Sequence, residues 1–197
     1  MDEGYIKFSC TFIDGNPPEE ESLTELNRAR RELYDLGLIG MYENGIGFGN
    51  ISKRVGKGFV ISGSATGGIE KLGPEHYALV TDYSLEDNSL ECIGRIKASS
   101  ESLTHAAVYE ACPSAKVVIH IHNLKAWNAL LDKVPTTAKV PYGTPEMAYE
   151  IFRLFKETDI ERERILVMAG HQEGIISFGN SCKGALQVLL EKVKPLL

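Results

Sequence analysis

The sequence has few cysteines, and their spacing is not that of a metal-binding or redox motif. The four thiols are at positions 10, 92, 112 and 182, and no Cys-x-x-Cys unit occurs. This spacing excludes a structural zinc knuckle and a thioredoxin-like motif. We interpret the cysteines as reduced and mostly buried thiols.

Positive charge is also scarce. The chain has 21 lysines and arginines against 27 aspartates and glutamates, which gives a formal net charge of −6. No block of basic residues stands out against this background, and the isoelectric point is near 5.4. A nucleic-acid partner is therefore not expected.

Long hydrophobic runs are missing as well. No apolar stretch is long enough to span a bilayer, and residues 1–4 (MDEG) are acidic where a secretory signal would be basic and then apolar. We therefore expect a cytoplasmic protein that does not contact a membrane.

The residues that are present suit a globular fold. The chain has 197 residues, of which 43% are hydrophobic, and we found no linker, internal repeat or low-complexity tract. We expect one domain over residues 1–197. Apolar periodicity and turn residues predict strands at residues 5–13, near 51, at 59–61, 78–81, 90–93, 117–122, 165–169 and 175–178, and helices at 22–36, 99–111, 124–131, 145–156 and 182–193. Strands bracketed by helices in one chain indicate an α/β layered fold.

Two histidines stand two residues apart in the apolar stretch 117–122, which reads VVIHIH. Neighbouring side chains of a strand point to opposite faces, so His120 and His122 project together while Ile119 and Ile121 pack behind them. Packing explains two adjacent imidazoles poorly, whereas a divalent cation can bind both. The alternative is a core histidine satisfied by one backbone hydrogen bond.

A third histidine occupies a similar position. His171 follows the apolar run 165–169, where a buried strand gives way to a loop. Three imidazoles leave room at an ion for a fourth ligand or a substrate, as a catalytic site requires. The three histidines together predict a metal site.

The stretch Ser99, Ser100 and Glu101 stands where a helix is expected to begin. Serine hydroxyls are good helix caps, and the exposed N–H groups of a helix start also bind anions. Capping alone is the simpler interpretation, with Glu101 complementing the helix dipole and His105 pairing with it one turn later.

Taken in order, these pieces resemble the core signature of the class II aldolase and adducin superfamily. Residues 97–123 read KASSESLTHAAVYEACPSAKVVIHIHN and contain the serines, the glutamate and the paired histidines. Residues 47–52 (GFGNIS) and 58–68 (GFVISGSATGG) resemble the family's glycine-rich segments, and 167–179 (VMAGHQEGIISFG) resembles the segment of the third histidine. The resemblance extends over roughly residues 23–190.

The resemblance implies a role for each matching residue. His120, His122 and His171 match the ligands of one divalent ion, which is usually zinc in the family, with manganese, cobalt or iron as alternatives. Glu101 matches the carboxylate that ligates the resting metal and then acts as general base. The substrate phosphate would be held by Asn50, Thr66, Gly67, Ser99 and Ser100, with Ser64 as an alternative to Thr66.

The resemblance further implies a three-layer α/β/α sandwich with a central, largely antiparallel β-sheet, assembled as a homotetramer. The implied reaction is metal-dependent cleavage of a phosphorylated ketose to dihydroxyacetone phosphate and a small aldehyde through an enediolate. Epimerase relatives have aspartate where Glu101 stands, so the glutamate favours cleavage or dehydration. A ketose-phosphate dehydratase and a non-catalytic adducin-like interaction module are the alternatives, although the adducin-like relatives lack the three histidines.

Two features depart from the family pattern. The segment between His122 and Pro141 contains no counterpart of the tyrosine that donates a proton to the aldehyde oxygen, and Tyr142 is the nearest aromatic residue. The third histidine is followed by Gln172-Glu173-Gly174, where the family usually has glycine directly. Both departures concern the aldehyde half of the substrate.

Overall fold

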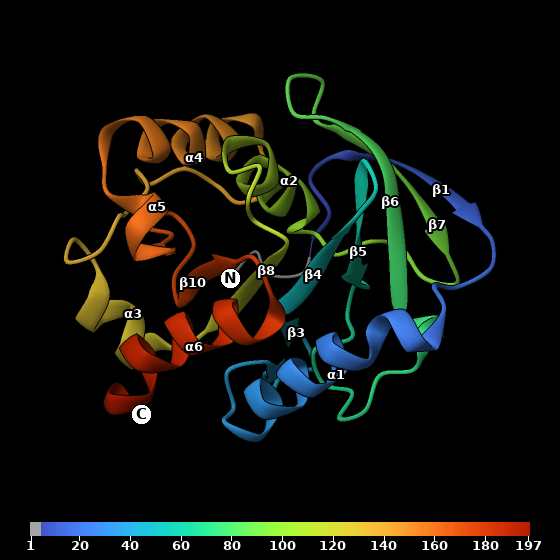
Figure 1. Cartoon of the computed structure of the whole chain (residues 1–197), viewed down its shortest axis with the longest axis horizontal. Helices are drawn as coiled ribbons and strands as arrows, with labels where there is room; N and C mark the ends of the chain where they lie inside the picture. The colour runs from blue at the N-terminus through green and yellow to red at the C-terminus, as the bar shows by residue number, and fades with distance from the viewer. Residues whose placement is uncertain (1–4) are drawn as a thin grey trace.

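A single eight-stranded β-sheet passes through the protein in the computed structural model, which describes residues 5–197 (Figure 1). The strand order is β1-β7-β6-β5-β4-β8-β10-β9, and every pairing is antiparallel except that of β1 with β7. Its strands are β1 (Ser9–Asp14), β4 (Asn50–Val55), β5 (Gly58–Ser62), β6 (Tyr77–Ser84), β7 (Ser89–Gly94), β8 (Val117–His122), β9 (Ile165–Val167) and β10 (Gly174–Gly179). A separate small hairpin pairs β2 (Gly40–Met41) with β3 (Gly47–Phe48).

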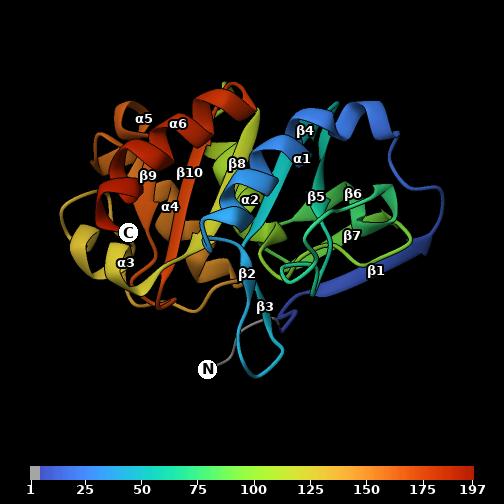
Figure 2. The same ribbon diagram turned by 90° about the horizontal axis from the view of Figure 1, so that it is seen from below.

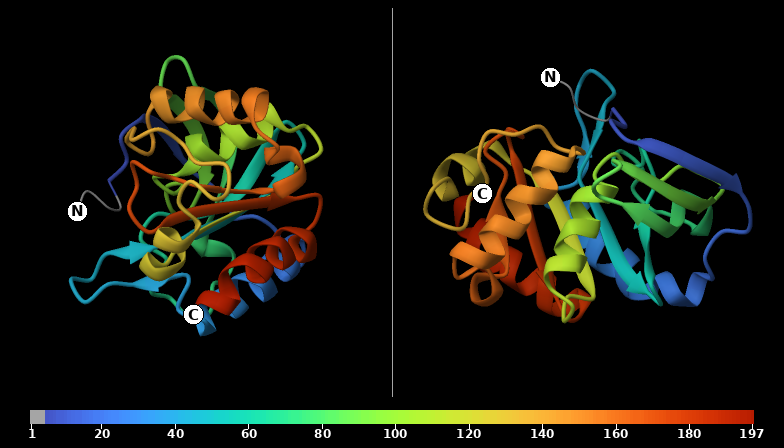
Figure 3. Two further views of the ribbon diagram at one scale, coloured as in Figure 1. Left: turned by 90° about the vertical axis from the view of Figure 1, so that its left-hand side faces the viewer. Right: turned by 90° about the horizontal axis from the view of Figure 1, so that it is seen from above.

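Helices cover both faces of this sheet. They are α1 (Glu20–Asp35), α2 (Ser102–Ala111), α3 (Leu124–Leu130), α4 (Pro145–Glu157), α5 (Ile160–Glu163) and α6 (Cys182–Val193), with 3₁₀ turns at Pro74–His76 and Lys194–Leu196. Helices α1 and α6 contact each other on one side, and α2 packs against α4 on the other. Figure 3 shows the sheet between these two pairs, and Figure 2 shows α1 and α6 side by side across it. The fold is thus the expected α/β/α sandwich with a mostly antiparallel sheet.

Alternation along β8 assigns its side chains to two separate cores. Ile119 and Ile121 belong to the apolar cluster that includes Leu26 and Leu33 of α1. Val118 belongs to the other cluster, which includes residues of α2 and α4. His120 and His122 share the face of Val118, so they point toward the α2 layer with the isoleucines packed behind them, as the sequence pattern predicts.

Most boundaries lie close to the predicted ones, but two predicted starts were wrong. The first strand begins at Ser9 rather than residue 5, because the ladder to β7 starts with the pair Ser9 and Ser89. Helix α2 begins at Ser102 rather than at residue 99. Ser99, Ser100 and Glu101 form a preceding turn in which the N–H of Ser102 donates to the carbonyl of Ser99 at 3.0 Å.

Candidate active site

Three imidazole nitrogens converge in the interior of the protein. The Nε2 atom of His122 lies 2.9 Å from Nε2 of His120 and 3.1 Å from Nε2 of His171. All three side chains are buried. Two nitrogens at adjacent corners of a tetrahedral zinc site are about 3.3 Å apart, given zinc–nitrogen bonds of about 2.0–2.1 Å. The spacing is therefore close to that of a metal-binding triad.

The sheet register places the three rings. His120 pairs with Asn50 of β4 on one side and with Ile176 of β10 on the other, and His122 pairs with Gly174. A Cβ atom added at Gly174 would lie 2.6 Å from Cδ2 of His171 and 3.1 Å from Cε1 of His120. Glycine at position 174 therefore leaves the space that two of the imidazoles occupy.

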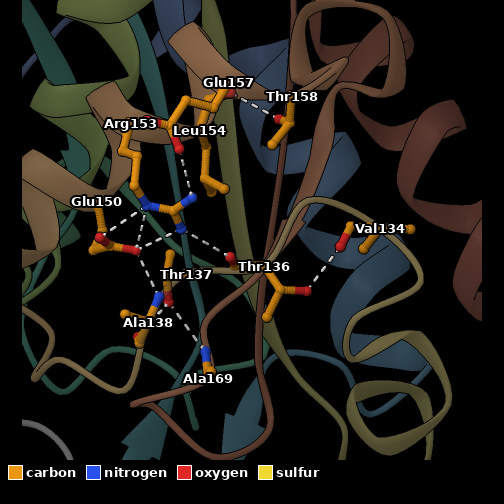
Figure 4. A network of polar contacts seen from close by, with 10 residues as sticks. All are labelled: Val134, Thr136, Thr137, Ala138, Glu150, Arg153, Leu154, Glu157, Thr158 and Ala169. Carbon is orange, nitrogen blue, oxygen red and sulfur yellow. Dashed lines mark hydrogen bonds and ion pairs between the residues drawn. The ribbon is translucent and has the colours of Figure 1, made fainter.

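The loop of His171 is supported from behind by a polar network on α4 (Figure 4). Glu150 and Arg153 of α4 bind each other, and Glu150 also accepts a hydrogen bond of 2.6 Å from the N–H of Ala138. The hydroxyl of the neighbouring Thr137 accepts a hydrogen bond of 3.1 Å from the N–H of Ala169, two residues before His171. Helix α4 thus fixes the segment that presents the third histidine.

Burial keeps these imidazoles neutral. It lowers the pKa of His120 to about 4. Burial also lowers the pKa of His122 and of His171 well below the usual value. A proton would further be repelled by His120 and His171 at His122, and by His120 and Lys7 at His171. A neutral imidazole offers a lone pair, which is the form that binds a metal.

Glu101 adds an oxygen to the three nitrogens. Its Oε1 atom lies 3.3 Å from Nε2 of His171 and 3.9 Å from Nε2 of His120, and the carboxylate is buried. Three imidazoles and a carboxylate suit zinc, manganese, cobalt or iron. The donor set therefore fits one divalent ion, held by His120, His122 and His171 with Glu101 beside it.

A small polar pocket adjoins Glu101. It contains all five residues predicted to bind a phosphate, together with Ser64, and is lined by Gly47, Gly49, Asn50, Gly63, Ser64, Ala65, Thr66, Gly67, Ser99 and Ser100. Oδ1 of Asn50 is buried and has no hydrogen-bond partner within residues 5–197. The hydroxyl of Thr66 donates to the carbonyl of Gly63 at 2.8 Å, and both hydroxyl candidates of this turn, Ser64 and Thr66, line the pocket.

A buried arginine holds the wall of this pocket. Arg30 of α1 is 2% exposed and donates to the carbonyls of Thr66 and Gly67 at 2.9 and 3.0 Å, and to that of Glu70 at 3.2 Å. A guanidinium is costly to bury without partners, and these three carbonyls provide them. Arg30 therefore fixes the turn that carries Thr66 and Gly67.

Other neighbours of the site were only partly foreseen. The ring centroid of Tyr142 lies 4.5 Å from that of His171, so this tyrosine packs on the third histidine. Nζ of Lys7 lies 3.8 Å above the same tyrosine ring. His105 binds Ser52 through Nδ1 at 2.7 Å, whereas its spacing in the sequence suggests a pairing with Glu101.

Sequence reasoning missed three contributors: Arg30, Tyr42 and Glu173. The signal for Arg30 was a charged residue in the apolar stripe of α1. The signal for Glu173 was an acidic residue two positions after a predicted ligand. Tyr42, whose hydroxyl lies 2.8 Å from Nδ1 of His122, gave no signal, because 80 residues separate the two.

Known structures share this fold. L-fuculose-1-phosphate aldolase from Thermus thermophilus is 24% identical, with 88% of this chain and 91% of that chain covered and a TM-score of 0.61. A sugar-phosphate aldolase from Thermotoga maritima is 16% identical, with coverages of 89% and 93% and a TM-score of 0.65. The N-terminal class II aldolase domain of a conserved Thermoplasma acidophilum protein is 15% identical, with coverages of 91% and 94% and a TM-score of 0.62. The curated proteins gave no significant match.

Residues 24–193 match the model of the family described as the class II aldolase and adducin N-terminal domain. This match extends over most of the chain and includes every residue of the histidine triad and the adjoining pocket. Within residues 5–197, no helix is long and apolar enough to cross a membrane. The chain belongs to the class II aldolase and adducin family.

Proposed function

We propose that the protein is a metal-dependent aldolase that cleaves a phosphorylated ketose to dihydroxyacetone phosphate and a small aldehyde. The observation that carries this proposal is the position of Glu101. Its carboxylate lies 3.3 Å from the third imidazole of the triad, and it directly follows Ser99 and Ser100 of the polar pocket. A substrate phosphate in that pocket would thus bring the adjacent carbon atoms close to the carboxylate.

The pocket residues would hold the substrate by its phosphate. Asn50, Ser99 and Ser100 offer side-chain donors, while Thr66 and Gly67 belong to the turn that Arg30 holds. Anchoring the dianion away from the reacting carbon converts binding energy into orientation of the bond to be broken. Ser64 lines the same pocket and is available to contact the phosphate alongside Thr66.

Glu101 would move the proton at the reacting carbon. In cleavage, the carboxylate of Glu101 takes the proton of the substrate hydroxyl that becomes the aldehyde oxygen. The carbon–carbon bond breaks, its electron pair stays on the phosphorylated fragment as an enediolate, and the aldehyde leaves. The protonated carboxyl of Glu101 then gives its proton to that carbon, and in the reverse direction the carboxylate removes it. A divalent ion on His120, His122 and His171 would supply Lewis-acid stabilisation of the negative charge on the substrate oxygens.

We further propose that the whole chain, residues 1–197, works as one unit with one ion per subunit, in a cytoplasmic homotetramer. Zinc is the ion we propose, because nitrogen-rich sites of this size suit it, and manganese, cobalt and iron would fit the same donors. The homotetramer rests on the resemblance to the family, and the cytoplasmic location rests on the lack of a long apolar run in the sequence.

Deuterium exchange tests the enolising step without knowledge of the aldehyde. In heavy water, the metal-loaded protein should replace a hydroxymethyl proton of dihydroxyacetone phosphate with deuterium. Proton NMR measures this exchange as the loss of the substrate signal. Glu101→Gln should slow the exchange about 100- to 10,000-fold, because it removes the general base. Glu110→Gln is the matched control, since Glu110 lies exposed near the end of α2, the helix that follows Glu101. If the metal-loaded protein gives no exchange, the proposed aldolase activity is wrong.

A further inference from the structure

The Nδ1 side of His122 lies next to Tyr42 and Glu173, two residues that have no role in the proposed reaction. The hydroxyl of Tyr42 lies 2.8 Å from Nδ1 of His122 and donates a hydrogen bond of 2.7 Å to Oε2 of Glu173. Nδ1 is the ring nitrogen on the side away from the Nε2 atoms of His120 and His171. Tyr42 thus stands between the carboxylate and the imidazole.

The polarity of these two contacts determines the tautomer of the ring. A tyrosine hydroxyl has one hydrogen, which is donated to the carboxylate, so the oxygen faces His122 as an acceptor. Nδ1 must then carry the ring hydrogen, and Nε2 is left with a lone pair. That lone pair points to the place where the three Nε2 atoms converge.

We propose that Tyr42 and Glu173 are positioning residues that hold His122 in its metal-binding tautomer and raise its affinity for the ion. The inference rests on the metal site of the proposed function. Metal-bound imidazoles generally donate their other N–H to an outer partner that fixes the ring and increases its basicity. Here the partner is a phenol oxygen, and the negative charge behind it belongs to Glu173.

The backbone of Glu173 gives independent support. Its φ angle is +73°, in the left-handed region that residues with a side chain seldom adopt. Glycine would take this conformation without strain, whereas glutamate takes it at a cost in backbone energy. The presence of glutamate here is therefore consistent with a role for its side chain. The carboxylate is largely covered, with 19% of the side chain exposed.

Packing holds Tyr42 independently of its hydroxyl. Its ring centroid lies 4.5 Å from that of Phe48, which in turn stacks on His122 at 5.6 Å. The backbone of Tyr42 closes the turn between β2 and β3 through hydrogen bonds with Ile46 and Gly45. Tyr42→Phe should therefore keep the fold and remove only the hydroxyl contact.

The affinity for Zn²⁺, measured by competition with a chromophoric chelator, tests the inference without an activity assay. Tyr42→Phe and Glu173→Gly should each weaken zinc binding about 10- to 100-fold. Glu173→Gly should do so without lowering the thermal midpoint of the metal-free protein, because the backbone strain is relieved. Glu43→Gln, which removes an exposed carboxylate next to Tyr42, should bind zinc like the wild type.

Nitrogen NMR of the His122 ring adds a direct signature. The metal-free wild type should show the hydrogen on Nδ1, and Tyr42→Phe should reduce the population of that tautomer. Wild-type zinc affinity in either Tyr42→Phe or Glu173→Gly, or an Nε2-protonated ring in the wild type, would overturn the inference and leave the proposed function intact. A wild-type protein that binds none of zinc, manganese, cobalt and iron stoichiometrically would remove the proposed function and this inference with it.

Discussion

Buried hydrogen bonds from Ser52 to His105 and Tyr109 connect β4 to α2. The hydroxyl of Ser52 lies 2.7 Å from Nδ1 of His105 and 2.8 Å from the phenol oxygen of Tyr109. Arg54 donates to the carbonyl of Tyr109 at 2.6 Å and stacks on its ring. Nε2 of His105 is buried and has no hydrogen-bond partner among the described residues. A proton on this ring would therefore be poorly solvated.

His105 should make the stability of the protein depend on pH. Burial lowers its pKa well below the usual 6.5, with a smaller contribution from His120. The folded state therefore excludes a proton that the unfolded chain binds, and the free energy of unfolding falls as the pH falls below about 6.5. One such proton contributes about 1.4 kcal/mol per pH unit.

Replacing the His105 ring should make the free energy of unfolding depend less steeply on pH. His105→Gln should take up about one proton fewer on unfolding. Its free energy of unfolding should therefore fall less steeply between about pH 6 and pH 5, by about 1.4 kcal/mol per pH unit. Urea denaturation of the metal-free protein at several pH values measures the slope. An unchanged slope would show that His105 is protonated in the folded protein.

At the scale of elements, α1 supports the wall of the polar pocket through the buried side chain of Arg30. Arg30 lies in the apolar stripe of the helix, between Leu26 and Leu33, which pack in the core. Its three acceptors are the main-chain carbonyls of the turn after β5. The shape of the pocket wall therefore depends on a contact between two elements far apart in sequence.

Arg30→Met should damage both stability and anion binding. The substitution leaves the buried carbonyls of Thr66 and Gly67 without their donor, at an expected cost of about 3 kcal/mol in the free energy of unfolding. Binding of inorganic phosphate, followed by calorimetry, should weaken by at least about tenfold because the turn loses its support. Arg28→Gln is the matched control, since Arg28 lies exposed on the same helix and its loss should leave phosphate binding unchanged. Equal phosphate affinity in Arg30→Met and wild type would contradict this account.

The predictable parts of the molecule are those that depend on local pattern. Alternation in residues 117–122 was enough to place His120 and His122 on one face, and the helix predicted over residues 22–36 is observed as α1 at Glu20–Asp35. The parallel pairing of β1 with β7 was not predictable, because strand order depends on tertiary packing. The contact of Tyr42 with His122 and Glu173 was missed for the same reason.

At the scale of the molecule, the triad brings together side chains from parts of the chain that are far apart in sequence. His120 and His122 come from β8, the third strand from the β9 edge, whereas His171 comes from the loop between β9 and β10. Glu101 comes from the turn that begins α2. An ion bound by all of these groups would connect an inner strand of the sheet, a loop near its edge and the turn that leads into α2.

Metal removal should therefore lower the stability of the whole fold. An ion that binds only the folded state stabilises it by about 4 kcal/mol at a free concentration near 1,000 times its Kd. For a chain of this size, each kcal/mol shifts the melting temperature by about 2–4 °C, so zinc should raise the midpoint by about 8–16 °C over the chelator-treated protein. Scanning calorimetry measures the shift. His122→Ala should melt at the same temperature with and without zinc, because the nitrogen shared by both close contacts of the triad is gone. Identical midpoints for the zinc-loaded and chelated wild type would mean that the three imidazoles do not bind the ion.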